Sequence, residues 1–349
     1  MAFGKKSKLA AGLDVGTNSI KLIKLRKKGD SYILKALAIK ELPLGVISDE
    51  EIKDRDAVIF DIQSLVDQTD PKLKEIVLSI SGHGVITDKI VIDRKSGAEA
   101  EQAILFEAEQ RSPFDVEDVT LDYHIISEDV ETNKMEVLLV AARNEFLKSY
   151  LDMIIDAGLK PVIVDTDAFA ILNAYKINYD IDPSRVTALI DMGFDVTNMI
   201  FLKDGLYHST RDVSNGVRII FDAISKEFRL NQELTAKAIR GEMDGSIDQD
   251  MFKATIVTAS EELVAGLEVA ISYFKNSSGA EQVDWIVLSG GGALIPFLPE
   301  MLQAKLSTPI EICNPLRNIE YDPDMFIEFQ PEKVAPLLAV PVGLAARNI

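Results

Sequence analysis

Two copies of one turn stand about half a chain apart, each between two apolar runs with the pattern of β-strands. The first is Gly12-Leu13-Asp14-Val15-Gly16-Thr17, and the second is Leu189-Ile190-Asp191-Met192-Gly193, followed by Thr197. An Asp and a Gly at a hairpin tip place a carboxylate beside backbone amides that no Cβ shields, and such amides bind anions. The repeat therefore predicts two similar lobes that hold one phosphate chain between them.

The strands around the two turns follow the same plan. Alternating apolar positions and β-branched residues predict strands over 11–15, 19–26 and 32–39, and again over 186–191, 197–202 and 206–210. The last two are joined by Lys203-Asp204-Gly205, which is typical of a hairpin turn. Two such meanders indicate a duplicated lobe in an α/β chain.

Further elements interrupt each lobe. Between the two copies, the sequence predicts strands over 85–92, 119–127, 134–142 and 162–165, and helices over 98–111 and 144–157. This βαββαβ order is typical of a compact inserted subdomain. Helical periodicity then covers 216–228, 234–240 and 250–276. A strand over 285–288 leads into Gly290-Gly291-Gly292 and a helical run over 296–306, and a short packing helix is expected near 340–347.

We therefore divide the chain into four parts. The first core subdomain comprises residues 1–84 and 165–185, with residues 85–164 as its insertion. The second core subdomain comprises 186–214 and 283–349, with the mainly helical residues 215–282 as its insertion. The two ends of an insertion are expected to lie close together.

Composition excludes several classes of protein. With 349 residues, 47% of them hydrophobic, the chain is long enough for more than one core of a globular protein. Its net charge of −19 argues against a nucleic-acid surface. One cysteine, Cys313, cannot form an internal disulfide, which suits a reducing compartment. No apolar run reaches the roughly 18 to 20 residues of a membrane span, so no transmembrane segment and a cytoplasmic location are expected.

The turns carry the candidate chemistry. Backbone amides around Gly16 and Gly193 are expected to face phosphate oxygens, and the hydroxyls of Thr17, Ser19 and Thr197 are expected to add hydrogen bonds. The glycine run 290–292 follows a strand and precedes a helix, a context that lets the backbone approach a nucleotide. No Lys-Ser or Lys-Thr pair follows that run, which excludes a P-loop enzyme.

The two Asp residues of the turns are the candidate metal ligands. Asp14 and Asp191 are expected to hold Mg²⁺ through its waters, because this ion gives up water reluctantly. Lys21 lies two residues after Ser19 on the same strand, where it fits a phosphate contact, an ion pair or a solvated strand position.

Together, the three glycine turns resemble the phosphate 1, phosphate 2 and adenosine motifs of the superfamily of actin, sugar kinases and heat-shock chaperone ATPases. Residues 167–170 match the position of its first connecting helix, and Gly343 and Ala346 fall in the second. The resemblance covers nearly the whole chain and implies an α/β, actin-like (ribonuclease H-like) fold of two lobes with ATP and Mg²⁺ between them.

Within that superfamily, the βαββαβ insertion resembles the cell-division actin homologue and the type IV pilus assembly family PilM. Three details favour the PilM family: the position of Lys21 on its strand, the stretch 112–123, and the end at Ile349. The cell-division protein is expected to continue into a linker and an amphipathic membrane helix.

The resemblance also implies roles for single residues. It puts Asp14 and Asp191 near magnesium. At the phosphates it puts Gly16, Thr17, Asn18, Ser19, Gly193 and Thr197, and at the adenosine Gly290, Gly291 and Gly292. Glu233 and Lys237 match ribose and adenine contacts, although two residues four apart on a helix also form ordinary ion pairs. Asp167 matches a carboxylate that orients attacking water in hydrolysing relatives.

The second turn departs from the pattern of active relatives. Many of them have a small residue after the Asp-x-Gly, whereas this chain has Phe194-Asp195. A bulky ring and a second negative charge are expected to crowd or repel the terminal phosphate. Weak ATP hydrolysis, or none, is therefore expected.

The resemblance implies a cytoplasmic ATP-binding adaptor of the type IV pilus inner-membrane complex. A groove between the first lobe and its insertion would take a short N-terminal cytosolic peptide of a PilN-like membrane protein, which would hold the chain at the inner membrane. Other pilus assembly proteins, the motor complex and a second copy of the chain are further implied partners. The alternatives are a working ATPase and an actin-like cell-division or filament-forming ATPase.

Overall fold

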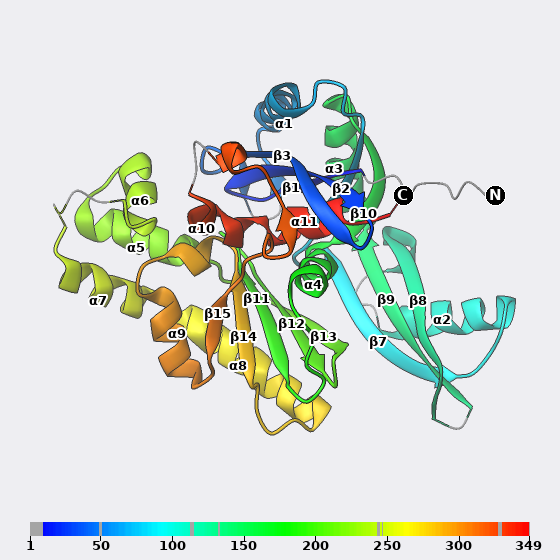
Figure 1. Cartoon of the computed structure of the whole chain (residues 1–349). Coiled ribbons are helices and arrows are strands. Elements are labelled where there is room, and N and C mark those ends of the chain that lie inside the picture. The colour runs from blue at the N-terminus through cyan, green and yellow to red at the C-terminus, as the bar shows by residue number, and fades with distance from the viewer. Residues whose placement is uncertain are drawn as a thin grey trace.

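The computed structural model describes residues 10–48, 51–111, 115–131, 133–242, 245, 247–326 and 330–348. Two lobes are each built on one β-sheet, and a third, smaller sheet extends beside the second lobe (Figure 1). Of the details that favour the PilM family, residues 112–114 and Ile349 lie outside the described residues.

The first lobe contains a six-stranded sheet with the order β10-β6-β1-β2-β3-β16. Its strands are β1 (Ala11–Val15), β2 (Ser19–Lys28), β3 (Ser31–Glu41), β6 (Glu75–Ile80), β10 (Lys160–Thr166) and β16 (Ile319–Glu320). Helices α1 (Arg55–Thr69) and α3 (Asn144–Asp156) cover one face, and α4 (Asp167–Asn178) and α11 (Ala339–Ala345) cover the other. A two-stranded ribbon of β4 (Ile47–Ser48) and β5 (Glu51–Ile52) lies between β3 and α1 in the chain.

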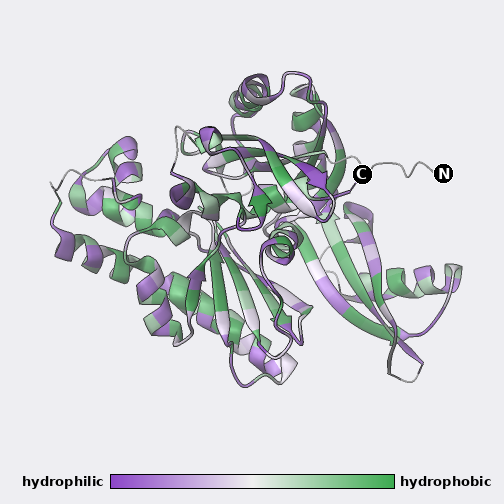
Figure 2. Ribbon diagram, viewed as in Figure 1, coloured by the Kyte–Doolittle hydropathy of each residue, from purple (hydrophilic) through white to green (hydrophobic). Residues whose placement is uncertain are grey.

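The second lobe contains a five-stranded sheet with the order β13-β12-β11-β14-β15. Its strands are β11 (Thr187–Met192), β12 (Thr197–Lys203), β13 (Leu206–Val213), β14 (Trp285–Ser289) and β15 (Ile310–Ile312). One core joins this sheet to the helices α5 (Arg218–Phe228), α6 (Gln232–Ile239), α7 (Gln249–Ala259), α8 (Glu261–Ser278) and α9 (Leu298–Leu306). Figure 2 shows apolar residues concentrated on the strands of the two lobes.

The predicted duplication is confirmed in the strand pairing. In both lobes, three consecutive antiparallel strands form a meander, and a parallel strand joins the first of them. Asp14 lies opposite Lys21 across the first hairpin, and Asp191 lies opposite Asn198 across the second. We call residues 14–19 the first turn and residues 191–197 the second turn.

The helix predicted over 250–276 is divided in two at Ser260. This side chain is fully buried, and its hydroxyl donates to the carbonyl of Ile256 at 2.6 Å. A serine that bonds back to the preceding turn weakens and bends a helix. The second piece, α8, packs near β13 of the second lobe, so part of residues 215–282 belongs to the core of that lobe.

The insertion in the first lobe has its elements in the predicted order. They are β7 (Val85–Asp93), α2 (Ala98–Arg111), a 3-10 turn (Val116–Asp118), β8 (Val119–Glu131), β9 (Lys134–Arg143), α3 and β10. The strands form a sheet with the order β7-β9-β8, and α2 packs against it. However, β10 pairs with β6, and α3 shares the core of the first lobe. The separate unit therefore spans 85–143 rather than 85–164.

The division of the sequence placed residues 283–349 in the second lobe. In the structure, however, the end of the chain returns to the first lobe. Helix α11 crosses α4 and packs beside β1. The remaining short elements of this part of the chain are helix α10 (Pro331–Val334) and the 3-10 turns Gly291–Leu294, Pro323–Phe326 and Ala335–Leu338. A Cβ on Gly343 would lie 1.7 Å from the carbonyl oxygen of Ala170, so the crossing requires glycine. The two predicted connecting segments thus meet between the lobes.

Among the described residues, no helix is long and apolar enough to cross a membrane.

Candidate functional site

A cavity of about 1440 Å³ lies between the two lobes, and both turns line it. Its volume exceeds the roughly 300 to 1,000 Å³ of ordinary ligand pockets. Helices α5 and α6 and the loop after β3 form one end, with Leu44, Ile219 and Ile239. The opposite end reaches the junction of the first lobe and its insertion, with Arg143, Phe146 and Tyr150.

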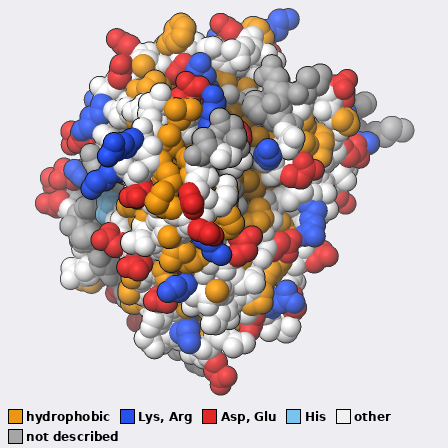
Figure 3. All heavy atoms as spheres, turned by 90° about the vertical axis from the view of Figure 1, so that its left-hand side faces the viewer, with side chains coloured by type: hydrophobic (Ala, Val, Ile, Leu, Met, Phe, Trp, Pro, Cys, Tyr) orange, Lys and Arg blue, Asp and Glu red, His pale blue; other side chains and the backbone are white. Residues whose placement is uncertain are grey.

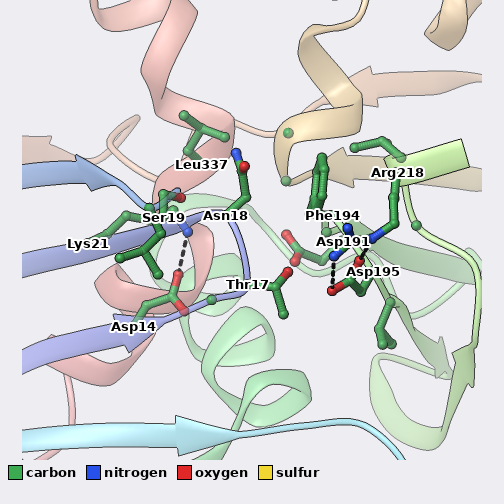
Figure 4. A pocket seen from close by; sticks show the side chains of 18 of the residues that line it. Asp14, Thr17, Asn18, Ser19, Lys21, Asp191, Phe194, Asp195, Arg218 and Leu337 are labelled. Atoms are coloured by element: carbon green, nitrogen blue, oxygen red, sulfur yellow. Dashed lines mark hydrogen bonds and ion pairs between the residues drawn. The ribbon is translucent and has the colours of Figure 1, made fainter. Parts of the chain in front are cut away.

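The first turn carries a buried ion pair. The Lys21 ammonium donates to the Asp14 carboxylate at 2.9 Å across the hairpin, and both side chains are almost enclosed (Figure 4). Their opposite positions in the register of β1 and β2 make this contact local. Of the roles considered for Lys21, the structure therefore contains the ion pair.

The second turn has no cation opposite its aspartate, because Asn198 takes the position that Lys21 has in the first. Instead, the Ser289 hydroxyl of β14 donates to Asp191 at 2.6 Å, and Asn198 donates to Asp212 at 2.9 Å. Burial raises the pKa of Asp191 to about 6, against the hydrogen bond from Ser289. The carboxyl keeps a partial exposure to the cavity.

A third carboxyl, Asp167, enters the cavity at the first residue of α4. The Ser79 hydroxyl at the end of β6 donates to it at 2.5 Å. Burial and then the negative charge of Asp14 raise the pKa of Asp167 to about 7. Asp14, Asp167 and Asp191 thus approach one cavity, although among the described residues no group of three or more Asp, Glu, His or Cys side chains is arranged to hold a metal ion.

Most of the predicted site residues line this cavity. They are Asp14, Gly16, Thr17, Asn18, Ser19, Lys21, Asp167, Asp191, Gly193, Glu233, Gly290 and Gly291. Gly290 has φ +80°, and an added Cβ would lie 2.5 Å from the Met192 carbonyl oxygen, so the glycine run is pressed against the second turn.

Three predicted residues are not among the lining residues. Thr197 is fully buried, and its hydroxyl donates to the Asn215 carbonyl at 2.9 Å rather than facing a phosphate. Gly292 packs against Met192, where an added Cβ would lie 2.5 Å from the methionine Cβ. Lys237 bonds to Glu233 at 2.7 Å, and both side chains are largely exposed. The structure thus contains the ordinary helical ion pair.

Phe194 and Asp195, which the sequence suggests would crowd or repel a terminal phosphate, both line the cavity, and each also has a partner within the second lobe. Phe194 is 8% exposed, belongs to the core of the second lobe and packs edge-on against Phe221. The Asp195 carboxylate binds the guanidinium of Arg218, with Nη2 donating at 2.9 Å and Nε donating to the other oxygen. The negative charge of Asp195 is therefore compensated within the lobe, whereas Asp191 has no cation opposite it.

The sequence of residues 12–349 matches the model of the family described as the type IV pilus assembly protein PilM. The chain belongs to this family. The predicted membership in the PilM family is confirmed, and the alternative of a cell-division or filament-forming ATPase is not favoured.

Solved structures support the same fold. A structure titled PilM-PilN type IV pilus biogenesis complex is similar over 97% of this chain and 98% of its own, with 26% identity and a TM-score of 0.85. The ethanolamine utilization protein EutJ from Carboxydothermus hydrogenoformans covers 98% of this chain and 90% of its own, at 15% identity and a TM-score of 0.58. MreB 5 of Spiroplasma citri bound to AMPPNP is similar over 97% of this chain and 95% of its own, with 13% identity and a TM-score of 0.53. The predicted actin-like fold is confirmed.

In this PilM-family chain, several residues that line the cavity or lie behind its lining escaped the sequence prediction. Ser79, Ser289 and Arg218 each contact an aspartate that the motifs had identified. Arg240 at the end of α6 donates to Glu41 at the end of β3 at 2.7 Å, which joins the two lobes across the cavity. These contacts connect residues between 23 and 199 positions apart, so no local motif could have indicated them.

Proposed function

We propose that the chain is a nucleotide-responsive adaptor of the type IV pilus assembly complex. It would bind Mg-ATP between the lobes and a PilN-like membrane protein at the junction of the first lobe and its insertion. One observation carries the proposal: two Asp-x-Gly turns line a single cavity that extends to that junction.

The lining residues fit a nucleotide in both size and chemistry. The amides of Gly16 and Gly193 donate to the carbonyls of Ser19 and Val196 within their own hairpins. Other amides of the two turns and the hydroxyls of Thr17 and Ser19 would therefore be the donors for phosphate oxygens. Gly290 and Gly291 let the backbone approach the adenosine. Leu44, Ala236 and Ile239 provide apolar contacts for a base at the α6 end of the cavity. Figure 3 shows hydrophobic side chains among charges of both signs on the side of the molecule that lies at the left in Figure 1.

An ion that is held mainly through its waters does not need a cluster of three protein ligands, so Mg²⁺ is proposed at the phosphate end of the cavity. We propose that Asp14 and Asp191 contact the ion through its waters, since magnesium keeps most of its hydration shell. Its charge would stabilise the ionised forms of Asp191 and Asp167, whose pKa values are raised by burial. Lys21 would remain close enough to share Asp14 with the ion or to turn to a phosphate.

The partner site is proposed on the other end of the cavity. There Arg143, Phe146 and Tyr150 meet the first lobe, and an added Cβ on Gly84 would lie 2.8 Å from the Phe146 ring. The structure titled PilM-PilN type IV pilus biogenesis complex is similar to this chain over 97% of its residues. We propose that the N-terminal cytosolic segment of a PilN-like protein binds here and keeps the chain at the inner membrane.

Nucleotide and partner would be coupled through contacts between the lobes. Strand β7 of the insertion packs beside β13 of the second lobe, and Arg240 joins Glu41 across the cavity. A nucleotide that draws the lobes together would therefore also change the position of the insertion.

A thermal-shift measurement tests the nucleotide site. Mg-ATP is expected to raise the melting temperature of the wild-type chain, and Asp191→Asn is expected to reduce this increase because it removes the charge that faces the ion. Asp204→Asn, in the exposed β12–β13 turn, is the matched control. An increase that is equal in all three proteins would remove Asp191 from the site.

Titration calorimetry tests the partner site. The probe is a synthetic peptide with the N-terminal cytosolic sequence of a PilN-like protein from the same organism, added with and without Mg-ATP. Phe146→Ala is expected to weaken peptide binding, whereas Phe60→Ala, which removes a 67% exposed ring from α1, is expected to leave it unchanged. Equal affinity in all three proteins would contradict the site, and equal affinity with and without Mg-ATP would contradict the coupling.

Slow ATP hydrolysis is a second candidate function, because the pKa of Asp167 is raised to about 7 and lies near the operating pH of a general base. Sustained phosphate release that Asp167→Ala abolishes would support it. Tight ATP binding without phosphate release would reject it.

A further inference from the structure

The second turn carries a charged pair that the first turn lacks. Asp195, two residues after Gly193, holds both carboxylate oxygens against the guanidinium of Arg218, the first residue of α5. The guanidinium carbon lies 4.7 Å from the centre of the Phe194 ring. Both members of the pair line the cavity, and Figure 4 shows them on the opposite side from Lys21 and Asp14.

The backbone fixes this pair to the turn. The amide of Val217 donates to the Gly193 carbonyl at 3.0 Å, and the amide of Arg218 donates to the Phe194 carbonyl at 2.8 Å. An added Cβ on Gly216 would lie 2.4 Å from the Phe194 carbonyl oxygen. The start of α5 and the second turn therefore form one unit, which holds the guanidinium beside the second turn.

We propose that Arg218 exchanges Asp195 for the terminal phosphate of ATP and thereby distinguishes ATP from ADP. The proposal rests on the proposed nucleotide site. A planar guanidinium binds a carboxylate and a phosphate with the same forked geometry, so exchange between them needs a side-chain movement only. A terminal phosphate carries more negative charge than a carboxylate and is the stronger partner. With ADP bound, Arg218 would remain on Asp195.

This role explains why a second negative charge is tolerated at the phosphate turn. Without a nucleotide, Asp195 compensates the charge of a cation that lines a half-enclosed cavity. Asp167 and Asp191 add further carboxyl groups to that cavity, so a cation held in reserve offsets part of the repulsion that an incoming terminal phosphate meets.

Titration calorimetry with Mg-ATP and with Mg-ADP tests the proposal on the full chain. Arg218→Gln is expected to lower the preference for ATP over ADP about tenfold, the value of one charge-assisted hydrogen bond. Arg218→Lys keeps the positive charge but not the forked geometry, so its preference for ATP over ADP is expected to lie between those of the wild type and Arg218→Gln. Asp195→Asn weakens the competing partner and is expected to raise the preference about threefold.

Arg240→Gln is the matched control, since Arg240 also lines the cavity and pairs with a carboxylate, Glu41. It is expected to change the affinity for both nucleotides by the same factor. If Arg218→Gln also changed both affinities equally, Arg218 would have a structural role alone. If that variant failed to fold in a thermal melt, Asp195→Asn would decide, and an unchanged or lowered preference would overturn the proposal. A wild-type chain that bound neither nucleotide would instead overturn the proposed function itself.

Discussion

The two turns share one backbone plan but compensate their charges differently. In the first, Asp14 pairs with Lys21 of the same hairpin, seven positions away. In the second, Asp191 bonds to Ser289 from 98 positions away, and Asp195 pairs with Arg218 on a helix. The first turn is thus complete within β1 and β2, whereas the second depends on β14 and α5.

This difference separates a rigid half of the site from a half that can respond. Residues 15–19 of the first turn are partly exposed to the cavity and contact their own hairpin. The second turn is bonded to the first residues of α5, so a change at its tip reaches the helices behind it. We infer that the first turn anchors the nucleotide and that the second senses it.

The largest effect is expected from removing the local cation of the first turn. Lys21→Met leaves Asp14 as an uncompensated charge in a nearly enclosed site, which is expected to lower the free energy of unfolding by about 3 kcal/mol. Urea denaturation without nucleotide measures the change. In the double variant Asp14→Asn/Lys21→Met, most of the loss is expected to be recovered, because no charge then remains buried.

A control variant distinguishes the loss of a buried ion pair from the loss of an exposed one. Lys28 lies on β2, like Lys21, and forms an exposed ion pair with Glu320 of β16. Lys28→Met is therefore expected to lower the free energy of unfolding by less than about 1 kcal/mol. Equal losses for Lys21→Met and Lys28→Met would show that the first turn does not depend on its buried ion pair.

The next effect tests how tightly the second turn is packed. An added Cβ would lie 2.4 Å from the Phe194 carbonyl oxygen at Gly216 and 2.7 Å from the Val196 carbonyl oxygen at Gly193, but 3.3 Å from the nearest atom at Gly16. Gly216→Ala and Gly193→Ala are therefore expected to destabilise the chain by about 2 kcal/mol, and Gly16→Ala by less than about 1 kcal/mol. Thermal melts of the three variants measure the loss of stability. A larger loss for Gly16→Ala than for the other two variants would contradict the tighter packing of the second turn.

Replacing Asp191 and replacing Asp14 are expected to change the stability of the chain in opposite directions at pH 8. The pKa of Asp191 is raised to about 6, so the folded chain binds its proton more tightly than the unfolded chain, and the associated stability is lost as the pH rises through 6. Because cavity water screens part of the charge, Asp191→Asn is expected to stabilise the nucleotide-free chain by only about 1 kcal/mol at pH 8, and hardly at pH 5. Asp14→Asn is expected to destabilise it at pH 8, since Lys21 loses its partner.

Urea denaturation of both variants at the two pH values makes the measurement. Destabilisation by Asp191→Asn at pH 8 would contradict the assignment of an uncompensated charge to the second turn. Stabilisation by both variants would remove the distinction between the turns.

The sequence predicted the strands and turns but not their distant partners. Alternating residues around Asp14 and Asp191 determine hairpins locally, so β1 was predicted with its observed bounds. The position of β10 depends on pairing with β6, and the course of α11 depends on contact between Gly343 and Ala170, neither of which leaves a periodic pattern. Arg218 was missed for the same reason, since the first residue of a helix carries no mark of the carboxylate it will meet.

The smallest effect separates two hydroxyls that the sequence treats alike. Thr17 lines the cavity, whereas Thr197 is fully buried and donates to the Asn215 carbonyl. Thr17→Val is expected to weaken Mg-ATP binding about fivefold, as for one lost hydrogen bond, without changing the melting temperature. Thr197→Val is expected to lower the free energy of unfolding by about 1 kcal/mol, because a buried carbonyl loses its donor, while Mg-ATP affinity is unchanged. If Thr197→Val impaired binding as strongly as Thr17→Val, the hydroxyls of both turns would contact the phosphates, and the second turn would be an anchor like the first.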